Sequence, residues 1–305
     1  RKVRMTRVGI IGAGLMGTAV TQRLLGAGFE VLAYDVDADK RAAVGRLGAK
    51  AEASAAIVIA ACEVNVLCVF NTQQVEDVIA GPGGGVDVIA QGGLAGRIFV
   101  VTSTCDPDRL ARLAERVKAR GAHVLEAPIS GTSRQVAQGD GVGLIGGDEA
   151  VVEKARAVLD AICPRRHDLG DIGNGSRAKL AINLILGLNR AALAEGLVFA
   201  SRLGLDPVAF LGVARGSAAY SQVMDVKGSL MARREYGNPQ SRVDQSLKDF
   251  NLVLEQARAA GQALPFAAVY VRMLEDCMAH GEGEWDNAAL AEAITRRRGV
   301  VPSRS

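Results

Sequence analysis

The chain is poor in the residues that build metal centres and disulfide frameworks. Only three of its 305 residues are histidine, and His123, His167 and His280 are too dispersed to indicate a metal site. The five cysteines are odd in number, stand at irregular spacing and form no C-x-x-C pair. They therefore predict reduced thiols in a cytoplasmic protein rather than a disulfide framework. The cysteines are Cys62, Cys68, Cys105, Cys163 and Cys277.

Aromatic residues and unbalanced charge are also scarce. Phe, Trp and Tyr make up 4% of the chain and hydrophobic residues 49%, which is typical of a soluble, helix-rich α/β protein. The 36 basic and 33 acidic residues are interspersed, so no basic stripe indicates a nucleic-acid partner. No apolar run reaches membrane-span length without interruption, and Arg1-Lys2-Val3-Arg4 precedes a strand rather than a signal-peptide core. The length suffices for two domains with substantial cores.

The start of the chain carries the pattern of a dinucleotide-binding unit. An apolar strand, Val8–Ile11, precedes the G-x-G-x-x-G run Gly12-Ala13-Gly14-Leu15-Met16-Gly17, and a helical pattern follows. The first glycine permits the tight turn, the second lets the backbone approach a pyrophosphate, and the third lets the helix pack close to the strand. The helix N-terminus would then meet the phosphates with unpaired N–H groups.

The acid that follows the second strand bears on the choice of nucleotide. The strand Glu30–Tyr34 ends at Asp35, and this context makes the glycine motif far more specific than it is alone. The carboxylate of Asp35 would accept hydrogen bonds from the adenosine ribose hydroxyls and repel a 2′-phosphate, which favours NAD over NADP. Lys40 and Arg41 lie close enough to leave NADP open.

Strands and helices continue to alternate through the first half of the chain. In an open parallel sheet, ligands bind at the carboxyl ends of strands. Those ends carry Asn71-Thr72, Ser103-Thr104 and Ser130-Gly131-Thr132, although Ser103 equally fits an ordinary turn. Ser130-Gly131-Thr132 offers backbone N–H groups and two hydroxyls, a nest that suits a small carboxylate. The strands expected here are Val64–Phe70, Ile98–Val101, His123–Glu126, Val142–Ile145 and His167–Leu169.

A long apolar helix is expected from Ser176, a candidate N-cap, to Arg202. About 27 residues would span about 40 Å, and so much apolar surface should be buried between two layers, joining two domains, 1–172 and 173–305. The second domain reads as all-helical. Lys179 and Asn183 share one face of the helix. They fit either a polar site or an asparagine bonded to a loop beside a lysine whose head reaches water.

The motifs, taken in order, resemble those of the β-hydroxyacid dehydrogenases, the family of 3-hydroxyisobutyrate dehydrogenase, tartronate semialdehyde reductase and 6-phosphogluconate dehydrogenase. The resemblance covers nearly the whole chain. It implies an α/β fold in which an N-terminal Rossmann-type doubly wound parallel sheet is joined by a long helix to an all-α C-terminal domain. It rests on Gly9–Gly17, Glu126–Gly131, Gly173-Asn174-Gly175 with Lys179 and Asn183, and Lys248-Asp249-Phe250.

The resemblance also implies an activity: reversible, NAD(P)-dependent oxidation of a small 3-hydroxy acid to its semialdehyde by hydride transfer. Lys179 is the implied catalytic acid/base, and Lys248 would lie by the nicotinamide and substrate, although from spacing alone Lys248 fits a solvated helix residue. A homodimer or homotetramer is expected by analogy of fold. The implied substrate residues are Ser130, Gly131, Thr132 and Asn183. The expected cofactor residues are Gly12, Gly14, Leu15, Met16, Gly17, Asp35, Asn71, Thr72, Thr104 and Lys248.

Departures from the family pattern leave the substrate open. Thr132 stands where many members have glycine, and its hydroxyl resembles the NADPH-dependent glyoxylate and succinic semialdehyde reductases. Ser241 replaces a common aromatic, and the following Arg242 fits either a bidentate clamp on a carboxylate or a solvated surface arginine. Imine reductases and, in a different class, non-catalytic NAD(P)-binding readers of partner proteins tend to lack the lysine at this place, so Lys179 argues against both.

Overall fold

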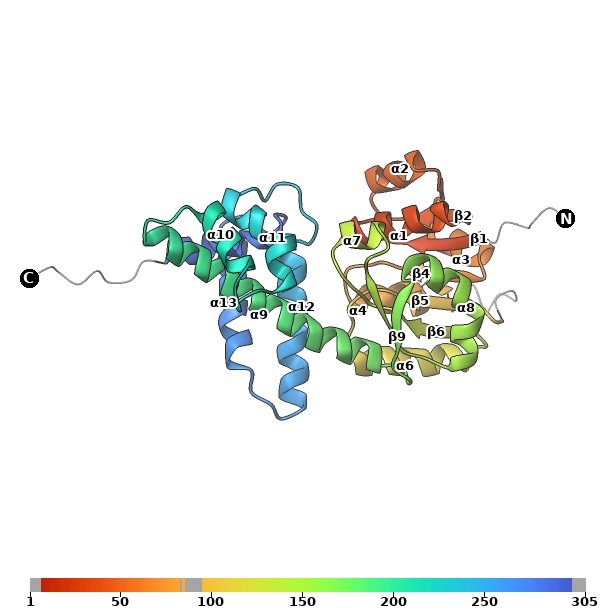
Figure 1. Cartoon of the computed structure of the whole chain (residues 1–305). Helices are drawn as coiled ribbons and strands as arrows, with labels where there is room; N and C mark the ends of the chain where they lie inside the picture. The colour runs from red at the N-terminus through yellow and green to blue at the C-terminus, as the bar shows by residue number, and fades with distance from the viewer. Residues whose placement is uncertain (1–6, 83, 86–94, 298–305) are drawn as a thin grey trace, which may run out of the picture. The chain divides into compact units, whose positions relative to one another are not determined.

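The computed structural model describes residues 7–82, 84–85 and 95–297, which divide into two compact units. The units are Arg1–Lys179 and Leu180–Ser305, and the division falls inside helix α9 (Asn174–Arg202) (Figure 1). The sequence pattern places the division before Gly173, whereas the first unit also includes the first turn of α9. The expectations for Arg1-Lys2-Val3-Arg4 lie outside the described residues.

A six-stranded parallel sheet forms the centre of the first unit. Its order is β3-β2-β1-β4-β5-β6, so the chain winds outward in both directions from β1 and β4. The carboxyl ends of these two strands mark the topological switch point, where ligands bind in such sheets. The strands are β1 (Arg7–Ile11), β2 (Glu30–Tyr34), β3 (Lys50–Ala51), β4 (Val64–Leu67), β5 (Ile98–Val101) and β6 (His123–Glu126).

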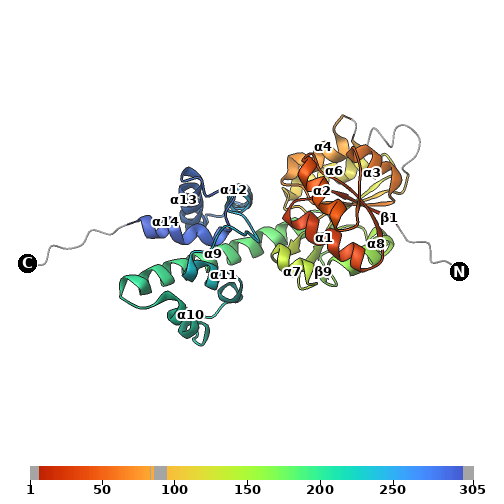
Figure 2. The same cartoon turned by 90° about the horizontal axis from the view of Figure 1, so that it is seen from above.

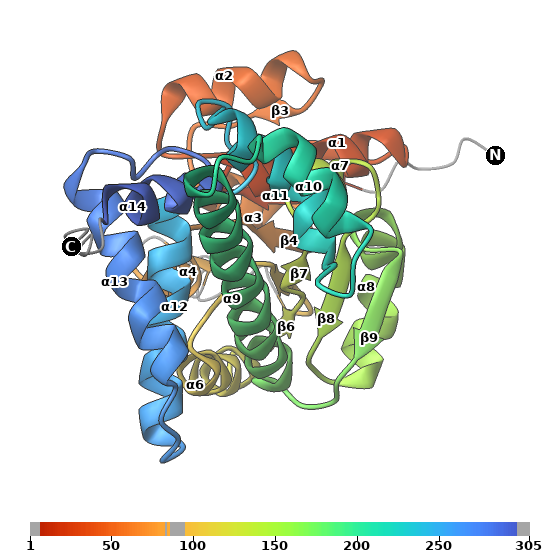
Figure 3. The ribbon, with the colours of Figure 1, turned by 60° about the vertical axis from the view of Figure 1, so that its left-hand side comes forward.

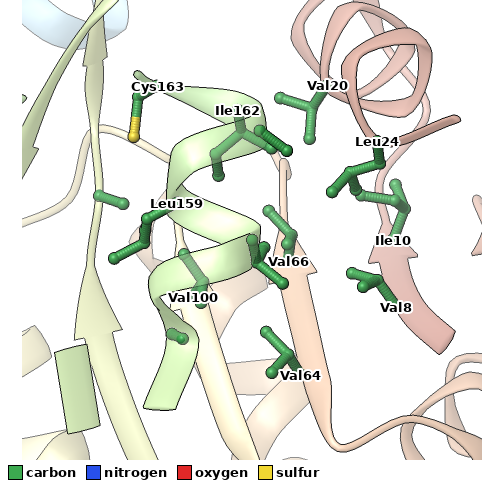
Figure 4. Close-up of a cluster of buried hydrophobic side chains, with 14 of the residues drawn as sticks. Val8, Ile10, Val20, Leu24, Val64, Val66, Val100, Leu159, Ile162 and Cys163 are labelled. Carbon is green, nitrogen blue, oxygen red and sulfur yellow. The ribbon is translucent and has the colours of Figure 1, made fainter. Parts of the chain in front are cut away.

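Helices cover both faces of this sheet (Figure 2). Successive strand residues point to opposite faces, so each face has its own apolar side chains to bury. On β5, Ile98 and Val100 join the apolar cluster under α1 (Leu15–Gly26) and α8 (Glu149–Ile162). Phe99 and Val101 join the cluster on the other face. That second cluster is covered by α3 (Ala55–Ala61), α4 (Thr72–Ala80) and α6 (Pro107–Lys118). Figure 4 shows Val20, Leu24, Leu159 and Ile162 beside Val8, Ile10, Val64, Val66 and Val100.

A small second sheet follows β6 and carries the chain toward α9. Its order is β7-β8-β9, with β7 antiparallel and β9 parallel to β8. An isolated bridge between Glu126 and Gly146 links it to the end of β6. Its strands are β7 (Ile129–Ser130), β8 (Val142–Ile145) and β9 (Arg165–Asp168). Two further helices within the described residues of the first unit are α2 (Ala38–Arg46) and α7 (Ser133–Ala137).

The described residues of the second unit are helical, as predicted. Within this unit, α9 passes between α10 and α11 on one side and α12 and α13 on the other (Figures 2 and 3). Gly187 permits that close crossing, since a Cβ there would stand 2.2 Å from the ring of Phe250 and 3.1 Å from that of Tyr270. The helices are α10 (Pro207–Arg215), α11 (Gln222–Arg233), α12 (Val243–Ala259), α13 (Pro265–Ala279), the 3₁₀ turn η1 (Asn287–Ala289) and α14 (Leu290–Arg296).

Helix α9 corrects two predictions. It begins at Asn174 rather than after Ser176. The hydroxyl of Ser176 donates to the side chain of Glu126, on β6, instead of capping the helix. It was predicted to be buried between two layers, yet only 22% of its most apolar 18-residue window is buried in the chain. By length and composition alone it could cross a membrane, although core helices of soluble proteins pass the same test. Some of its polar residues bond within the chain; for example, Nη1 of Arg190 donates to the hydroxyl of Tyr270.

Candidate active site

In the glycine loop between β1 and α1, two glycines lie against other backbone atoms and one faces open space. Gly12 has a φ of +95°, and a Cβ there would stand 2.5 Å from the carbonyl oxygen of Cys68. A Cβ on Gly17 would stand 1.9 Å from the carbonyl oxygen of Gly12. Around Gly14, by contrast, no atom lies within 4 Å of the Cβ position.

The first turn of α1 can receive an anion. Gly14 is its N-cap and forms no side-chain cap, and no acidic residue occupies the first turn. Backbone N–H groups at a helix start attract phosphate, so this loop fits a dinucleotide pyrophosphate. Leu15, at the start of the helix, is exposed, while Met16 packs against the apolar cluster.

Asp35 connects the end of β2 to this loop. Its Oδ2 accepts a hydrogen bond of 2.7 Å from the N–H of Ala13, and its Oδ1 accepts one of 2.9 Å from the N–H of Asp37. Each carboxylate oxygen retains a second lone pair, so Asp35 can still accept from a ribose hydroxyl.

The guanidinium of Arg41, near Asp35, already bonds to other groups of the chain. Nη1 of Arg41 donates to the carbonyl oxygens of Asp35 at 2.6 Å and Val36 at 3.1 Å. Its guanidinium carbon lies 5.8 Å from the centre of the Tyr34 ring. These contacts hold the guanidinium at the end of β2. Lys40 reaches Asp37 only at 3.9 Å, and both side chains are exposed.

The polar residues after β4 and β5 hold their two loops together. Oδ1 of Asn71 accepts from the N–H of Gln74 and caps α4. Oγ1 of Thr72 accepts from the N–H of Asp106 at 2.9 Å. Oγ of Ser103 donates to the carbonyl oxygen of Val69 at 2.7 Å, a loop-bridging role. Thr104 is partly buried on the same loop.

In the segment predicted to form a nest, Ser130-Gly131-Thr132, some of the hydrogen-bonding groups already bond within the chain. Gly131 has a φ of +146°, in the region that favours glycine. Thr132 forms a capping box at the start of α7: its Oγ1 accepts from the N–H of Gln135, and the side chain of Gln135 accepts from the N–H of Thr132 at 2.8 Å. That N–H is therefore already used, while the Thr132 hydroxyl can still donate its proton.

The amine of Lys179 lies against the same segment. The side chain is buried, and Nζ donates a hydrogen bond of 2.7 Å to the carbonyl oxygen of Ile129, the residue before Ser130. The structure thus brings Lys179 to the predicted substrate loop. Glu126 also bonds to the first turn of α9, whereas the sequence indicated it only as the end of a strand and the first residue of a family motif.

In the second unit, Asp249 joins two of the predicted residues. Its Oδ2 accepts from Nδ2 of Asn183 at 3.0 Å, and its Oδ1 lies 2.6 Å from Nζ of Lys248. The sequence indicated Asp249 only as part of a motif. Arg242 forms a bidentate ion pair with Asp244, at 3.0 and 2.5 Å, so a carboxylate of the same chain already occupies its fork.

The cysteine beside the glycine loop is a free thiol, and no candidate metal ligands gather among the described residues. Burial raises the pKa of Cys68 to about 11, and the hydrogen bond from Thr102 only partly opposes this shift. Cys68 therefore stays a thiol at neutral pH. No group of three His, Cys, Asp or Glu residues is placed to hold a metal ion within residues 7–82, 84–85 and 95–297.

Comparison with known proteins adds independent observations. The family model for the NAD binding domain of 6-phosphogluconate dehydrogenase matches residues 7–170, and the model for the NAD-binding domain of NADP-dependent 3-hydroxyisobutyrate dehydrogenase matches residues 173–294. The chain is 32% identical to 2-hydroxy-3-oxopropionate reductase of Escherichia coli (strain K12), over 94% of this chain and 97% of that one. It is 30% identical to the chloroplastic glyoxylate/succinic semialdehyde reductase 2 of Arabidopsis thaliana, over 94% and 79%.

A solved structure agrees in fold over nearly the same span. The crystal structure of 3-hydroxyisobutyrate dehydrogenase from Salmonella typhimurium superimposes with a TM-score of 0.85 and 28% identity, covering 94% of this chain and 99% of that chain. The glycine loop, the acid after β2 and the family matches all indicate NAD or NADP as the cofactor. The chain therefore belongs to the β-hydroxyacid dehydrogenase family of NAD(P)-dependent oxidoreductases.

Proposed function

We propose that the chain interconverts a small 3-hydroxy acid and its semialdehyde, with Lys179 as the general acid/base. One observation carries this proposal: the buried amine of Lys179 lies 2.7 Å from the carbonyl oxygen of Ile129, beside Ser130. A buried amine is costly unless polar groups meet it. Here it meets the loop that offers hydroxyls to a substrate.

The chain's residues would divide the reaction as follows. When bound, the nicotinamide cofactor supplies the hydride acceptor. The start of α1 and Gly14 would bind the pyrophosphate, and Asp35 would bind the ribose. In the oxidation direction, the neutral amine of Lys179 takes the proton from the substrate hydroxyl while the C–H bond gives up its electron pair, leaving a carbonyl. In reduction, the ammonium of Lys179 returns that proton to the carbonyl oxygen.

The substrate is a short organic anion. Ser130, Gly131 and Thr132 are proposed to bind its carboxylate, supported by the hydroxyls that remain able to donate. Asn183, one turn after Lys179 on α9, and Lys248 remain proposed substrate and cofactor residues. Two relatives are named for reducing short oxo acids, which supports a substrate of that size. The ion pair with Asp244 favours the surface interpretation of Arg242.

NAD is the proposed preferred cofactor. Asp35 stands at the ribose-binding position with a carboxylate that would repel a 2′-phosphate. Arg41, the nearest candidate to bind that phosphate, is held by two carbonyl oxygens and the Tyr34 ring. Replacing Asp35 with Asn should raise the affinity for NADP more than that for NAD, measured by titrating each reduced nucleotide.

A homodimer or homotetramer is proposed from the exposed apolar residues at the end of α9 and in α10. Phe199, Leu203 and Val213 are exposed by 64%, 64% and 68%. Soluble chains usually leave few such side chains close together, and exposed apolar patches commonly mark interfaces between proteins. A second copy of this chain would cover them. Light scattering should show a dimer or larger assembly that Phe199→Glu dissociates. The matched control Ile57→Glu, at an exposed position of α3, should leave it intact. The free thiols support a cytoplasmic location.

The experiment that tests the activity is an assay of NAD and NADP reduction against 3-hydroxyisobutyrate, 4-hydroxybutyrate, glycerate, threonate and serine. We expect turnover with at least one 3-hydroxy acid and faster turnover with NAD. Preference for NADPH with glyoxylate or succinic semialdehyde would establish the alternative reductase. Nucleotide binding without turnover across the panel, in both directions, would contradict the proposal and favour a non-catalytic reader.

A further inference from the structure

A buried carboxylate closes the N-terminus of α9. Glu126, the last residue of β6, has no exposed surface. Its Oε2 accepts from the N–H groups of Gly173 at 2.6 Å and Gly175 at 3.1 Å. Its Oε1 accepts from the N–H of Ser176 at 3.0 Å and from the hydroxyl of Ser176 at 2.5 Å. All four partners lie before or within the first turn of the helix.

Two glycines make this approach possible. A Cβ on Gly146 would stand 2.4 Å from Oε2 of Glu126, and a Cβ on Gly175 would stand 2.5 Å from the carbonyl oxygen of Leu144. Neither contact is compatible with a side chain. The backbone on both sides of the carboxylate is therefore shaped to let it reach the start of α9.

The same strand-to-loop segment holds α9 a second time, one turn later. Three residues after Glu126, the carbonyl oxygen of Ile129 accepts from Nζ of Lys179. Position 126 thus anchors the beginning of the helix, and position 129 receives the amine. Because both contacts come from one short segment, a shift of the helix start would move Nζ relative to Ser130.

The charge of the carboxylate suits its place. The first N–H groups of a helix have no partners within the helix, and the N-terminus carries partial positive charge. Hydrogen bonds from N–H groups to a carboxylate are stronger than neutral ones. A neutral amide in its place would offer one oxygen and direct an NH2 group at N–H donors.

We infer that Glu126 is a positioning residue for Lys179: its carboxylate holds the first turn of α9 so that the amine sits at the substrate loop. The inference rests on the proposed role of Lys179 as general acid/base. It adds a residue that acts through Lys179 and that does not itself touch the substrate.

The test compares Glu126→Gln with the unaltered protein, using the best substrate of the panel. We expect kcat to fall by about 10- to 100-fold, because a misplacement of about 1 Å has effects of this size. KM and the dissociation constant of NADH should stay within about twofold. Asp148→Asn, which weakens the cap of α8 instead, serves as the matched control and should keep kcat. An equal loss in Asp148→Asn, or unchanged kcat in Glu126→Gln, would overturn the inference.

A double-mutant cycle separates this inference from the proposed function. If Glu126 acts through Lys179, adding Glu126→Gln to Lys179→Ala should change the residual kcat by less than about twofold. Losses that simply multiply would show that Glu126 acts elsewhere. If Lys179→Ala alone keeps near-normal kcat, the proposed function fails, and that result is visible before the cycle is completed.

A milder variant covers the case in which Glu126→Gln does not fold. Ser176→Ala removes one hydroxyl donor and leaves the carboxylate and its three N–H partners in place. We expect a smaller fall in kcat, about two- to fivefold, with KM unchanged, and no further fall when it is combined with Lys179→Ala. Unaltered kcat in Ser176→Ala would contradict the inference.

Discussion

At the scale of single residues, three glycines in one loop have different physical reasons for lacking a side chain. Gly12 needs a positive φ and Gly17 a close approach to the carbonyl of Gly12, so both serve the fold. Gly14 faces open space, so its missing side chain serves only a ligand. The sequence could predict all three roles, because the motif's spacing places each glycine at a known point of the turn.

These differences predict opposite effects for two alanine substitutions. Gly14→Ala should leave the melting temperature nearly unchanged, yet raise the dissociation constant of NADH at least about tenfold, since the new methyl group would occupy the phosphate's space. Gly17→Ala should destabilise the fold by more than about 3 kcal/mol, because no shift of a flexible side chain relieves a backbone clash. Thermal unfolding and NADH fluorescence titration measure both. A stable Gly17→Ala protein would refute the assignment.

A buried thiol predicts a pH dependence of stability. Burial raises the pKa of Cys163 from 9.0 to about 12, partly offset by Arg166. The folded state therefore keeps this proton after the unfolded chain has lost it, so its contribution to stability is complete below pH 9 and is lost as pH rises from 9 toward 12. Between pH 8 and pH 10, the stability advantage of the unaltered protein over Cys163→Ala should shrink by about 1.4 kcal/mol. Urea unfolding at both values checks this, and a constant difference would contradict it.

At the scale of elements, boundaries with local causes were predictable. Ser54 and Asp206 cap α3 and α10 by accepting from N–H groups three residues away, so both helix starts were predictable from the local sequence. The start of α9 was not, because its cap comes from Glu126, a residue distant in sequence. Strand β4 ends at Leu67 rather than Phe70, since the chain turns there to let Asn71 cap α4.

The crossing of α9 with α12 predicts a compensating pair of substitutions. Gly187→Ala should lower the free energy of unfolding by about 1–3 kcal/mol, because the new Cβ overlaps the Phe250 ring. Phe250→Leu removes that ring, so the double variant should lose less stability than the sum of the two single changes. Chemical denaturation of the four proteins measures the coupling. Strict additivity would show that the two residues do not restrict one another.

At the scale of the whole molecule, the order of motifs identified the family, and the family matches confirm it. The fold and the cofactor class were predictable for the same reason: glycines, strand ends and apolar periodicity act locally. Contacts that join distant positions were not, which is why Glu126 and the Asp249 bridge to Asn183 were missed. The prediction of Thr132 as a donor to substrate overlooked its capping box with Gln135. The sequence could not predict which acid binds, because that depends on the shape of a pocket.

The most direct measurement concerns the amine of Lys179. Lys179→Ala should lower kcat for hydroxy-acid oxidation by about 10²- to 10⁴-fold while NADH binding is retained. Added methylamine should restore part of the turnover in proportion to its concentration, and oxidation is the right direction because the amine cannot condense with the hydroxy acid. A Lys179→Ala protein with near-normal turnover, or one that added amine leaves equally inactive while it still binds NADH, would contradict the account.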